Sequence, residues 1–172
     1  MMNANDPGPA SNHDELHRTP VVNGHLPRGA LRGLQSTNRN VPSAAADRCT
    51  VLICDDRDEL RAAIIKVLAN VAKFEVIGEA VDGAGCLAMV HTAQPDVLIL
   101  DIGMPGGGPH VAKAARALRP AMHILVFSGI RDDKVRAEML RAGADEYLVK
   151  TGRLRPLLEA MDRAFTHHSR LR

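Results

Sequence analysis

Five short apolar segments divide the chain from residue 49 onward, and each has the length of a buried β-strand. They are CTVLIC (49–54), FEVIG (74–78), DVLIL (96–100), HILVF (123–127) and EYLV (146–149). Strands of a parallel sheet are covered on both faces, so they consist of continuous apolar runs instead of alternating ones. The pattern therefore predicts five strands of a parallel sheet.

Between and after these segments, apolar residues recur every three or four positions, which is the period of one helix face. The clearest sets are Leu60, Ile64, Val67, Leu68 and Val71; Val111, Ala114, Ala115 and Leu118; and Leu154, Leu157, Leu158, Met161 and Phe165. Pro120 follows the second set, and Gly143 ends a stretch that begins near Asp132; both residue types commonly mark helix ends. Strands that alternate with helices predict a doubly wound α/β domain of five strand–helix units.

The first 48 residues have a different texture. They consist largely of Asn, Pro, Gly, Ser, His and Arg, and their few large aliphatic residues follow neither a helical nor a strand period. Such a segment cannot bury enough apolar surface to offset the entropy lost on ordering. We therefore predict a disordered N-terminal tail over residues 1–48 and one folded domain over residues 49–170.

Composition and charge exclude several classes of function. The 22 Lys and Arg residues nearly balance the 20 Asp and Glu residues, and aromatic residues make up 2% of the chain with no Trp. A nucleic-acid surface needs a basic face or exposed rings, so we expect no direct nucleic-acid binding. No window is long and apolar enough to span a bilayer. The three cysteines show no metal-binding spacing and indicate reduced thiols, so we expect a soluble cytoplasmic protein.

Polar residues stand where the predicted strands end. Asp55 and Asp56 follow the first strand, Asp101 the third, Ser128 the fourth and Lys150 the fifth. Ligands of doubly wound sheets bind at the carboxyl ends of the strands, so these side chains should meet at one edge. Clustered carboxylates repel one another and favour a bound cation, and an all-oxygen set suits Mg²⁺ best. The sequence therefore predicts a magnesium site at this edge.

With these residues at its strand ends, the chain resembles the receiver domain of two-component response regulators. The matching stretches are VLICDD (51–56), GEAVDG (78–83), PDVLILDIGMPGG (95–107), ILVFSG (124–129) and RAGADEYLVK (141–150). They occur in the order and at the spacing of that family, and each closes or joins one strand. The resemblance implies a flavodoxin-like fold, with a doubly wound five-stranded parallel sheet in the order 2-1-3-4-5 and five helices. The receiver domain would span residues 49–170.

The resemblance also implies the roles of the acidic residues. Asp101 matches the phosphoryl acceptor of the family, which takes the phosphoryl group from a phosphohistidine. Asp56 and Asp55 match the acidic pair that binds Mg²⁺, with Asp101 itself and the backbone carbonyl of Gly103 as the further protein ligands. Phosphoryl transfer to a carboxylate depends on in-line positioning and on neutralisation of charge, which Mg²⁺ and a Lys can supply.

Three other positions match the family's phosphoryl-binding and switch residues. Ser128 stands where a hydroxyl binds a phosphoryl oxygen, and Lys150 where an ammonium neutralises another. Tyr147 matches the aromatic residue that changes rotamer when that hydroxyl moves. The chain departs from the family pattern at Thr151, where many receivers have Pro, and in the long glycine run 106–108 before Pro109.

Several of these residues also have plain structural interpretations. An Asp at the end of a strand is commonly a helix cap, which is an equal interpretation of Asp55 taken alone. Ser128 is alternatively the cap of the helix near Asp132, and Tyr147 is alternatively a half-buried packing residue. A cap is a weaker interpretation of Asp101, because four other strand-end residues, Asp55, Asp56, Ser128 and Lys150, fit the same pattern.

The favoured function is a phosphorylation-dependent signalling switch and not a conventional turnover enzyme, although it would dephosphorylate itself. The expected partner is a sensor histidine kinase or a histidine phosphotransfer protein. Output would pass to a downstream protein or to a homodimer through the face of the fourth helix and fifth strand, with no membrane contact. Few residues follow the last helix, so we expect either a stand-alone receiver or a DNA-binding regulator lacking its helix-turn-helix effector.

An enzyme with an aspartyl nucleophile is the alternative from another class. Phosphatases of that kind generally place a second Asp two residues after the first, where it acts as the acid and base. Gly103 occupies that position here, which weighs against the enzyme.

Overall fold

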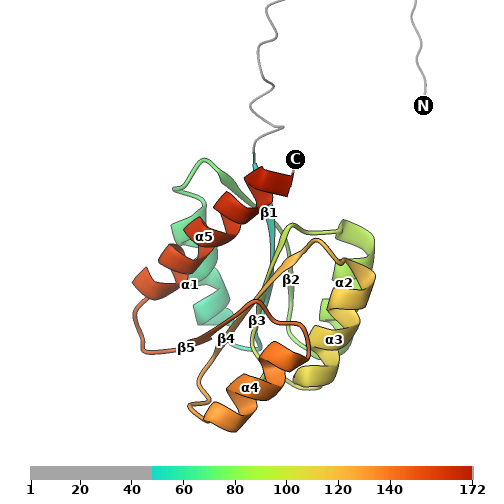
Figure 1. Cartoon of the computed structure of the whole chain (residues 1–172). Helices are drawn as coiled ribbons and strands as arrows, with labels where there is room; N and C mark the ends of the chain where they lie inside the picture. Colours follow the sequence, from blue (N-terminus) through green and yellow to red (C-terminus); the bar gives the residue numbers. More distant parts are fainter. Residues whose placement is uncertain (1–47, 172) are drawn as a thin grey trace, which may run out of the picture. The chain divides into compact units, whose positions relative to one another are not determined.

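The computed structural model describes residues 48–171, without the side chain of Leu171 (Figure 1). The predicted disorder of the N-terminal tail concerns residues that lie outside this range, apart from Arg48. The elements alternate strictly along the chain. They are β1 (Cys49–Cys54), α1 (Asp58–Leu68), β2 (Phe74–Ala80), α2 (Gly83–Ala93), β3 (Val97–Leu100), α3 (Pro109–Leu118), β4 (His123–Ser128), α4 (Asp133–Arg141), β5 (Glu146–Val149) and α5 (Arg155–Leu171).

The five strands form one parallel sheet in the order β2-β1-β3-β4-β5, which confirms the predicted fold. Figure 1 shows α1 and α5 on one face of the sheet and α2, α3 and α4 on the other. Each face has its own apolar core, and alternate residues of a strand enter opposite cores: Leu52 packs toward α2 and α3, whereas Ile53 packs toward α1 and α5. No helix within residues 48–171 is long and apolar enough to cross a membrane.

The predicted elements differ from the observed ones mainly at their ends. Strand β2 continues past Gly78 to Ala80, because its last residues still pair with β1 and the exposed Glu79 is held by Arg61 of α1. Strand β3 begins at Val97, one residue later than the predicted segment. Leu118 is 38% exposed although the helical period placed it with the buried residues, since it lies in the last turn of α3, beyond the core.

Asp96 joins three elements at the amino-terminal edge of the sheet, the edge where the strands begin. Its Oδ2 accepts hydrogen bonds from the backbone nitrogen and the hydroxyl of Thr50 at 2.9 and 2.8 Å, and its Oδ1 accepts one from Arg119 at 3.1 Å. Burial alone would raise the pKa of Asp96, but the hydrogen bonds from Thr50, together with His168 and Arg119, bring it below its ordinary value. The folded protein therefore stabilises the ionised form of this carboxyl group.

The stability of the domain is expected to fall in acid because of Asp96. A carboxyl group whose pKa is lower in the folded state contributes stability above its unfolded pKa of about 4, and this contribution is lost as the pH falls further. Asp96→Asn should therefore lower the free energy of unfolding by about 1–3 kcal/mol at pH 7. The difference from the wild type should shrink below about pH 4. Urea unfolding across this pH range measures it, with the exposed Asp133→Asn as control; a difference independent of pH would contradict the assignment.

Candidate functional site

The polar residues predicted at the strand ends meet at the carboxyl-terminal edge of the sheet. Lys150, directly after β5, places its Nζ 2.6 Å from Oδ2 of Asp55 and 2.6 Å from Oδ2 of Asp101. These two carboxylates follow the neighbouring central strands β1 and β3, and their side chains are only 4% and 7% exposed. Two acids and one base that lie far apart in the sequence are thus brought together in a largely buried position.

Asp101 is oriented by its own loop. Its backbone nitrogen donates to the carbonyl of Cys54 at 2.8 Å, and its Oδ1 accepts a hydrogen bond from the backbone nitrogen of Gly103 at 2.9 Å. A Cβ at position 103 would lie 3.4–3.6 Å from the carboxylate oxygens of Asp101. The glycine therefore leaves space beside this carboxylate that any side chain would narrow.

The glycine run that follows is tightly packed. A Cβ on Gly107 would lie 2.8–2.9 Å from the carbonyl oxygens of Ile102 and Met104, closer than real side chains approach backbone. A Cβ on Gly83, the first residue of α2, would lie 2.0 Å from the carbonyl oxygen of Gly106. Glycine is therefore required where this loop meets α2, and the loop after Asp101 is held in a defined position.

Asp55, Asp56 and Asp101 form a cluster that fits a divalent cation. One carboxylate oxygen of each lies within 4.8 Å of the others, and Asp56 is exposed whereas the other two are buried. Three carboxylates and the Lys150 ammonium give a formal charge of −2. Hard cations such as Mg²⁺ take carboxylate oxygens and retain waters, for which the exposed side at Asp56 leaves access. The position of the Gly103 carbonyl as a further ligand stays a prediction.

The groups next to this cluster alter its charge little. Arg57 places its Nε 3.6 Å from Oδ1 of Asp55, but its side chain is 55% exposed, so solvent screens the interaction. A hydrogen bond with Cys86 is the main cause that raises the pKa of the Cys54 thiol, and burial is the second. The thiol next to Asp55 in the sequence therefore stays neutral. Lys150 is thus the principal cation facing the buried carboxylates among the described residues.

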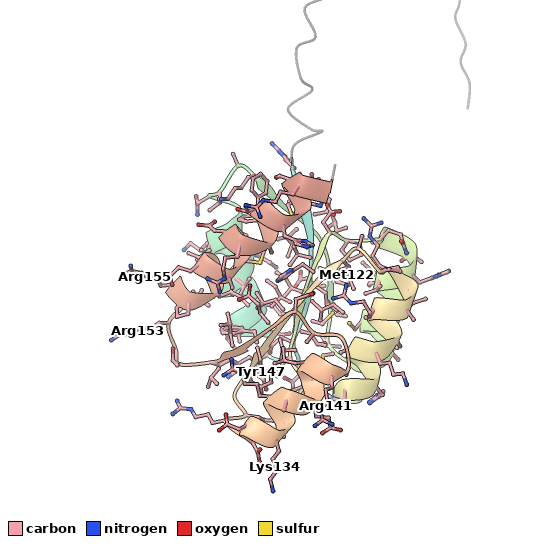
Figure 2. The ribbon with its side chains drawn as sticks, in the orientation of Figure 1. Met122, Lys134, Arg141, Tyr147, Arg153 and Arg155 are labelled. Atoms are coloured by element: carbon pink, nitrogen blue, oxygen red, sulfur yellow. The ribbon has the colours of Figure 1, made fainter. Side chains whose placement is uncertain are left out.

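Ser128 and Tyr147 both contact the backbone of Ile130. The backbone nitrogen of Ile130 donates to Oγ of the fully buried Ser128 at 3.4 Å, and the Tyr147 hydroxyl donates to the carbonyl of Ile130 at 2.9 Å. Tyr147 is 7% exposed, and burial raises its pKa; a hydrogen bond with Ser128 acts in the opposite direction, and the nearby Asp101 and Asp132 charges add to the rise. Figure 2 shows this ring near β5, next to α4.

The alternative roles as helix caps receive little support. Asp132 is the residue that caps α4, accepting hydrogen bonds from Lys134 and Val135, so Ser128 does not serve that purpose. Asp55 accepts a hydrogen bond from the backbone nitrogen of Arg57 at 3.1 Å, but Arg57 is itself the N-cap position of α1 and makes no side-chain cap. Asp55 therefore supports the turn into α1 without capping the helix.

Two features of the site were missed by sequence reasoning. The Lys150 ammonium lies 5.8 Å from the centre of the Phe127 ring, which is a favourable position for a cation over an aromatic face. The link through Ile130 was also missed, because a backbone contact leaves no residue-type signal. Of these two features, only the Phe127 contact could have been found from the sequence, because Phe127 directly precedes Ser128 at the end of a predicted strand.

Comparison with known proteins identifies related chains. The family model described as the response regulator receiver domain matches residues 51–162. The response regulator GacA of Pseudomonas aeruginosa and the nitrate/nitrite response regulator NarL of Escherichia coli are each 30% identical over 116 residues, which is 67% of this chain. Both alignments cover 54% of the relative, so the chain spans about half the length of the curated relatives it matches.

Solved structures give the same result. The receiver domain of the putative response regulator NarL from Mycobacterium tuberculosis is 30% identical, with a TM-score of 0.64 over 69% of this chain and 97% of that one. A CheY-like receiver domain protein from Methanospirillum hungatei is 25% identical, with a TM-score of 0.64 over 73% of this chain and 99% of that one. The fold therefore agrees with that of known receiver domains.

Proposed function

The chain belongs to the response regulator receiver family, and we propose that it is a phosphorylation-dependent signalling switch in which Asp101 accepts a phosphoryl group from a phosphohistidine. The donor would be a sensor histidine kinase or a histidine phosphotransfer protein. Receiver domains are signalling domains and not classical enzymes, so the phosphorylated protein itself would carry the signal.

The observation that carries this proposal is the position of Lys150 between two buried carboxylates at 2.6 Å from each. In the transfer, an oxygen of Asp101 would form a bond to phosphorus while the bond from phosphorus to the imidazole nitrogen breaks, and that nitrogen keeps the electron pair. The transferred group carries its negative charge onto an already anionic edge. We expect Lys150 to neutralise that charge and the Ser128 hydroxyl to donate a hydrogen bond to a phosphoryl oxygen.

Mg²⁺ would be held by Asp55, Asp56 and Asp101, with the Gly103 carbonyl as a further ligand. When bound, the ion would neutralise the oxygens of the transferred group and of the acceptor. The formal charge of −2 that the three carboxylates and Lys150 leave supports a divalent cation. Lys150 and the metal would then divide the neutralisation of the phosphoryl group between them.

The contacts of Ile130 support a mechanism for the switch. A phosphoryl group on Asp101 would attract the Ser128 hydroxyl, which now accepts a hydrogen bond from the Ile130 backbone. Movement there would also disturb the Tyr147 hydroxyl bound to the Ile130 carbonyl. Tyr147 lines a cavity of about 340 Å³ between β5 and the start of α4, on the face where a downstream protein or a second copy would read the change.

A second candidate concerns the whole protein. The relatives include NarL of M. tuberculosis, named as a probable transcriptional regulatory protein, and alignment covers 54% of its length. The chain would then be the receiver part of a DNA-binding regulator, with DNA binding supplied by an effector domain outside the described fold. The aspartyl phosphatase has less support, because Gly103 carries no carboxyl group.

Mapping the phosphate tests the proposed function. Incubation of the full chain with acetyl phosphate and Mg²⁺ should add one phosphate, seen in the intact mass, and removal of Mg²⁺ with EDTA should prevent it. Borohydride reduces an aspartyl acyl phosphate to homoserine, so peptide mass spectrometry then identifies the residue. We expect this mark at position 101. A mark at another aspartate, or no incorporation with Mg²⁺ present, would contradict the proposal.

A further inference from the structure

A second group of metal-ligand side chains lies at the amino-terminal edge of the sheet, opposite Asp101. Cys49 is the first residue of β1, Asp96 directly precedes β3, and His168 belongs to the last turns of α5. One ligand atom of each lies within 4.8 Å of the others. Figure 1 shows the end of α5 close to the start of β1. Three elements from both ends of the domain therefore bring sulfur, oxygen and nitrogen donors together.

The three side chains are well shielded from solvent. Cys49 is fully buried, Asp96 is 8% exposed, and the His168 side chain is 16% exposed. Nδ1 of His168 lies 3.5 Å from Oδ1 of Asp96, and its Nε2 is buried without a hydrogen-bond partner among the described residues. Buried polar atoms of native proteins are normally satisfied, so the incomplete bonding of this imidazole requires an explanation.

The carboxylate of the group is already oriented. Thr50 donates twice to Oδ2 of Asp96, which fixes the plane of the carboxylate as outer hydrogen bonds commonly do around metal ligands. Oδ1 is on the side of His168. Arg119 also donates to Oδ1 at 3.1 Å, so a bound cation would share this oxygen with a guanidinium. This sharing lowers the affinity of the group for a cation but does not block the Cys49 and His168 donors.

We propose that Cys49, Asp96 and His168 bind a borderline-soft divalent cation of the Zn²⁺ class. Thiolate, imidazole and carboxylate together are a zinc donor set, whereas Mg²⁺ takes oxygen alone. Ligands of a tetrahedral zinc ion lie about 3.5 Å apart, so small side-chain rotations contract this group around an ion. Three protein donors leave the fourth position to water. Binding releases the Cys49 thiol proton to the buffer, and the metal then joins the start of β1 to the end of α5.

Cobalt spectroscopy on the full chain tests the proposal. With Mg²⁺ in excess to fill the aspartate cluster, Co²⁺ should produce a near-ultraviolet band from thiolate-to-metal charge transfer, and added Zn²⁺ should bleach it. The aspartate cluster has no sulfur, and tail histidines give no such band, so the signal is specific to a cysteine ligand. Cys49→Ala should abolish the band, and His168→Gln should weaken Zn²⁺ binding, measured by this competition, at least about tenfold.

Matched variants separate a metal site from a general effect on folding. Cys86→Ala removes an equally buried thiol of α2 and should keep the band, and His91→Gln removes an exposed imidazole of α2 and should keep the affinity. Circular dichroism and Asp101 phosphorylation report whether each variant folds. If Cys49→Ala does not fold, the His168→Gln result decides. Absence of a sulfur band in the wild type, its survival in Cys49→Ala, or wild-type Zn²⁺ affinity in His168→Gln would overturn the proposal.

Discussion

Replacing Asp101 with asparagine is expected to abolish phosphorylation of the chain by acetyl phosphate and by any phosphohistidine donor. An amide oxygen is a poor nucleophile, and the new NH₂ group would face either Lys150 or the Gly103 nitrogen, both of which are donors. We expect incorporation to fall at least about a thousandfold, to the background of the assay, because the covalent step loses its nucleophile. Intact-mass spectrometry over a time course measures the effect.

The fold should survive this substitution, since Lys150 keeps Asp55 as its partner. Asp133→Asn is the matched control, because it changes an exposed aspartate near the same edge and should leave incorporation unchanged. Undiminished incorporation in the Asp101 variant would show that another residue is the acceptor.

Lys150→Met should have the second largest effect, with the initial rate of phosphorylation reduced by about 100-fold or more. Removing one preorganised group that stabilises developing charge typically costs 10²–10³ in rate, about 3–4 kcal/mol. The buried carboxylates of Asp55 and Asp101 would also lose the ammonium that lies 2.6 Å from each. At about 4 Å and an effective dielectric of about 20, two such charges repel by about 4 kcal/mol.

Lys150→Met should therefore depend on Mg²⁺ for stability more strongly than the wild type does. Thermal unfolding with Mg²⁺ and with EDTA measures this dependence, and initial rates at several acetyl phosphate concentrations measure the loss of transfer. Lys113→Met on the exposed side of α3 is the control for charge alone. A rate within twofold of the wild type would exclude Lys150 from phosphoryl neutralisation.

The sequence predicts the fold well because its signals are local and mutually consistent. Each strand is a short run of large apolar residues, and DVLIL and HILVF correspond to strands buried on both faces. The topology then requires Asp55, Asp101 and Lys150 to share an edge, so the polar ends of these runs were enough to place the candidate site. Element ends were less well predicted, as at Leu118, because helical period does not show where a neighbouring element stops covering a helix.

Other parts of the molecule could not be predicted from the sequence. Cys49, Asp96 and His168 come from different elements, and no spacing rule relates residues separated by most of the domain. The contacts of Ser128 and Tyr147 with Ile130 depend on backbone atoms, which every residue possesses. The sequence could not decide between a packing role and a switch role for Tyr147 for the same reason, because it does not show which group the tyrosine hydroxyl contacts.

The shared contact at Ile130 has a consequence for what other molecules can sense. Its backbone is hydrogen-bonded to Ser128 through the nitrogen and to Tyr147 through the carbonyl, while the residue as a whole is 39% exposed. If phosphorylation shifts that backbone as proposed, the branched side chain of Ile130 would move with it and change the area of hydrocarbon exposed to water. The proposed change of charge at Asp101 would thereby alter the hydration of the surface, which would allow an apolar partner to detect it without contacting the phosphate.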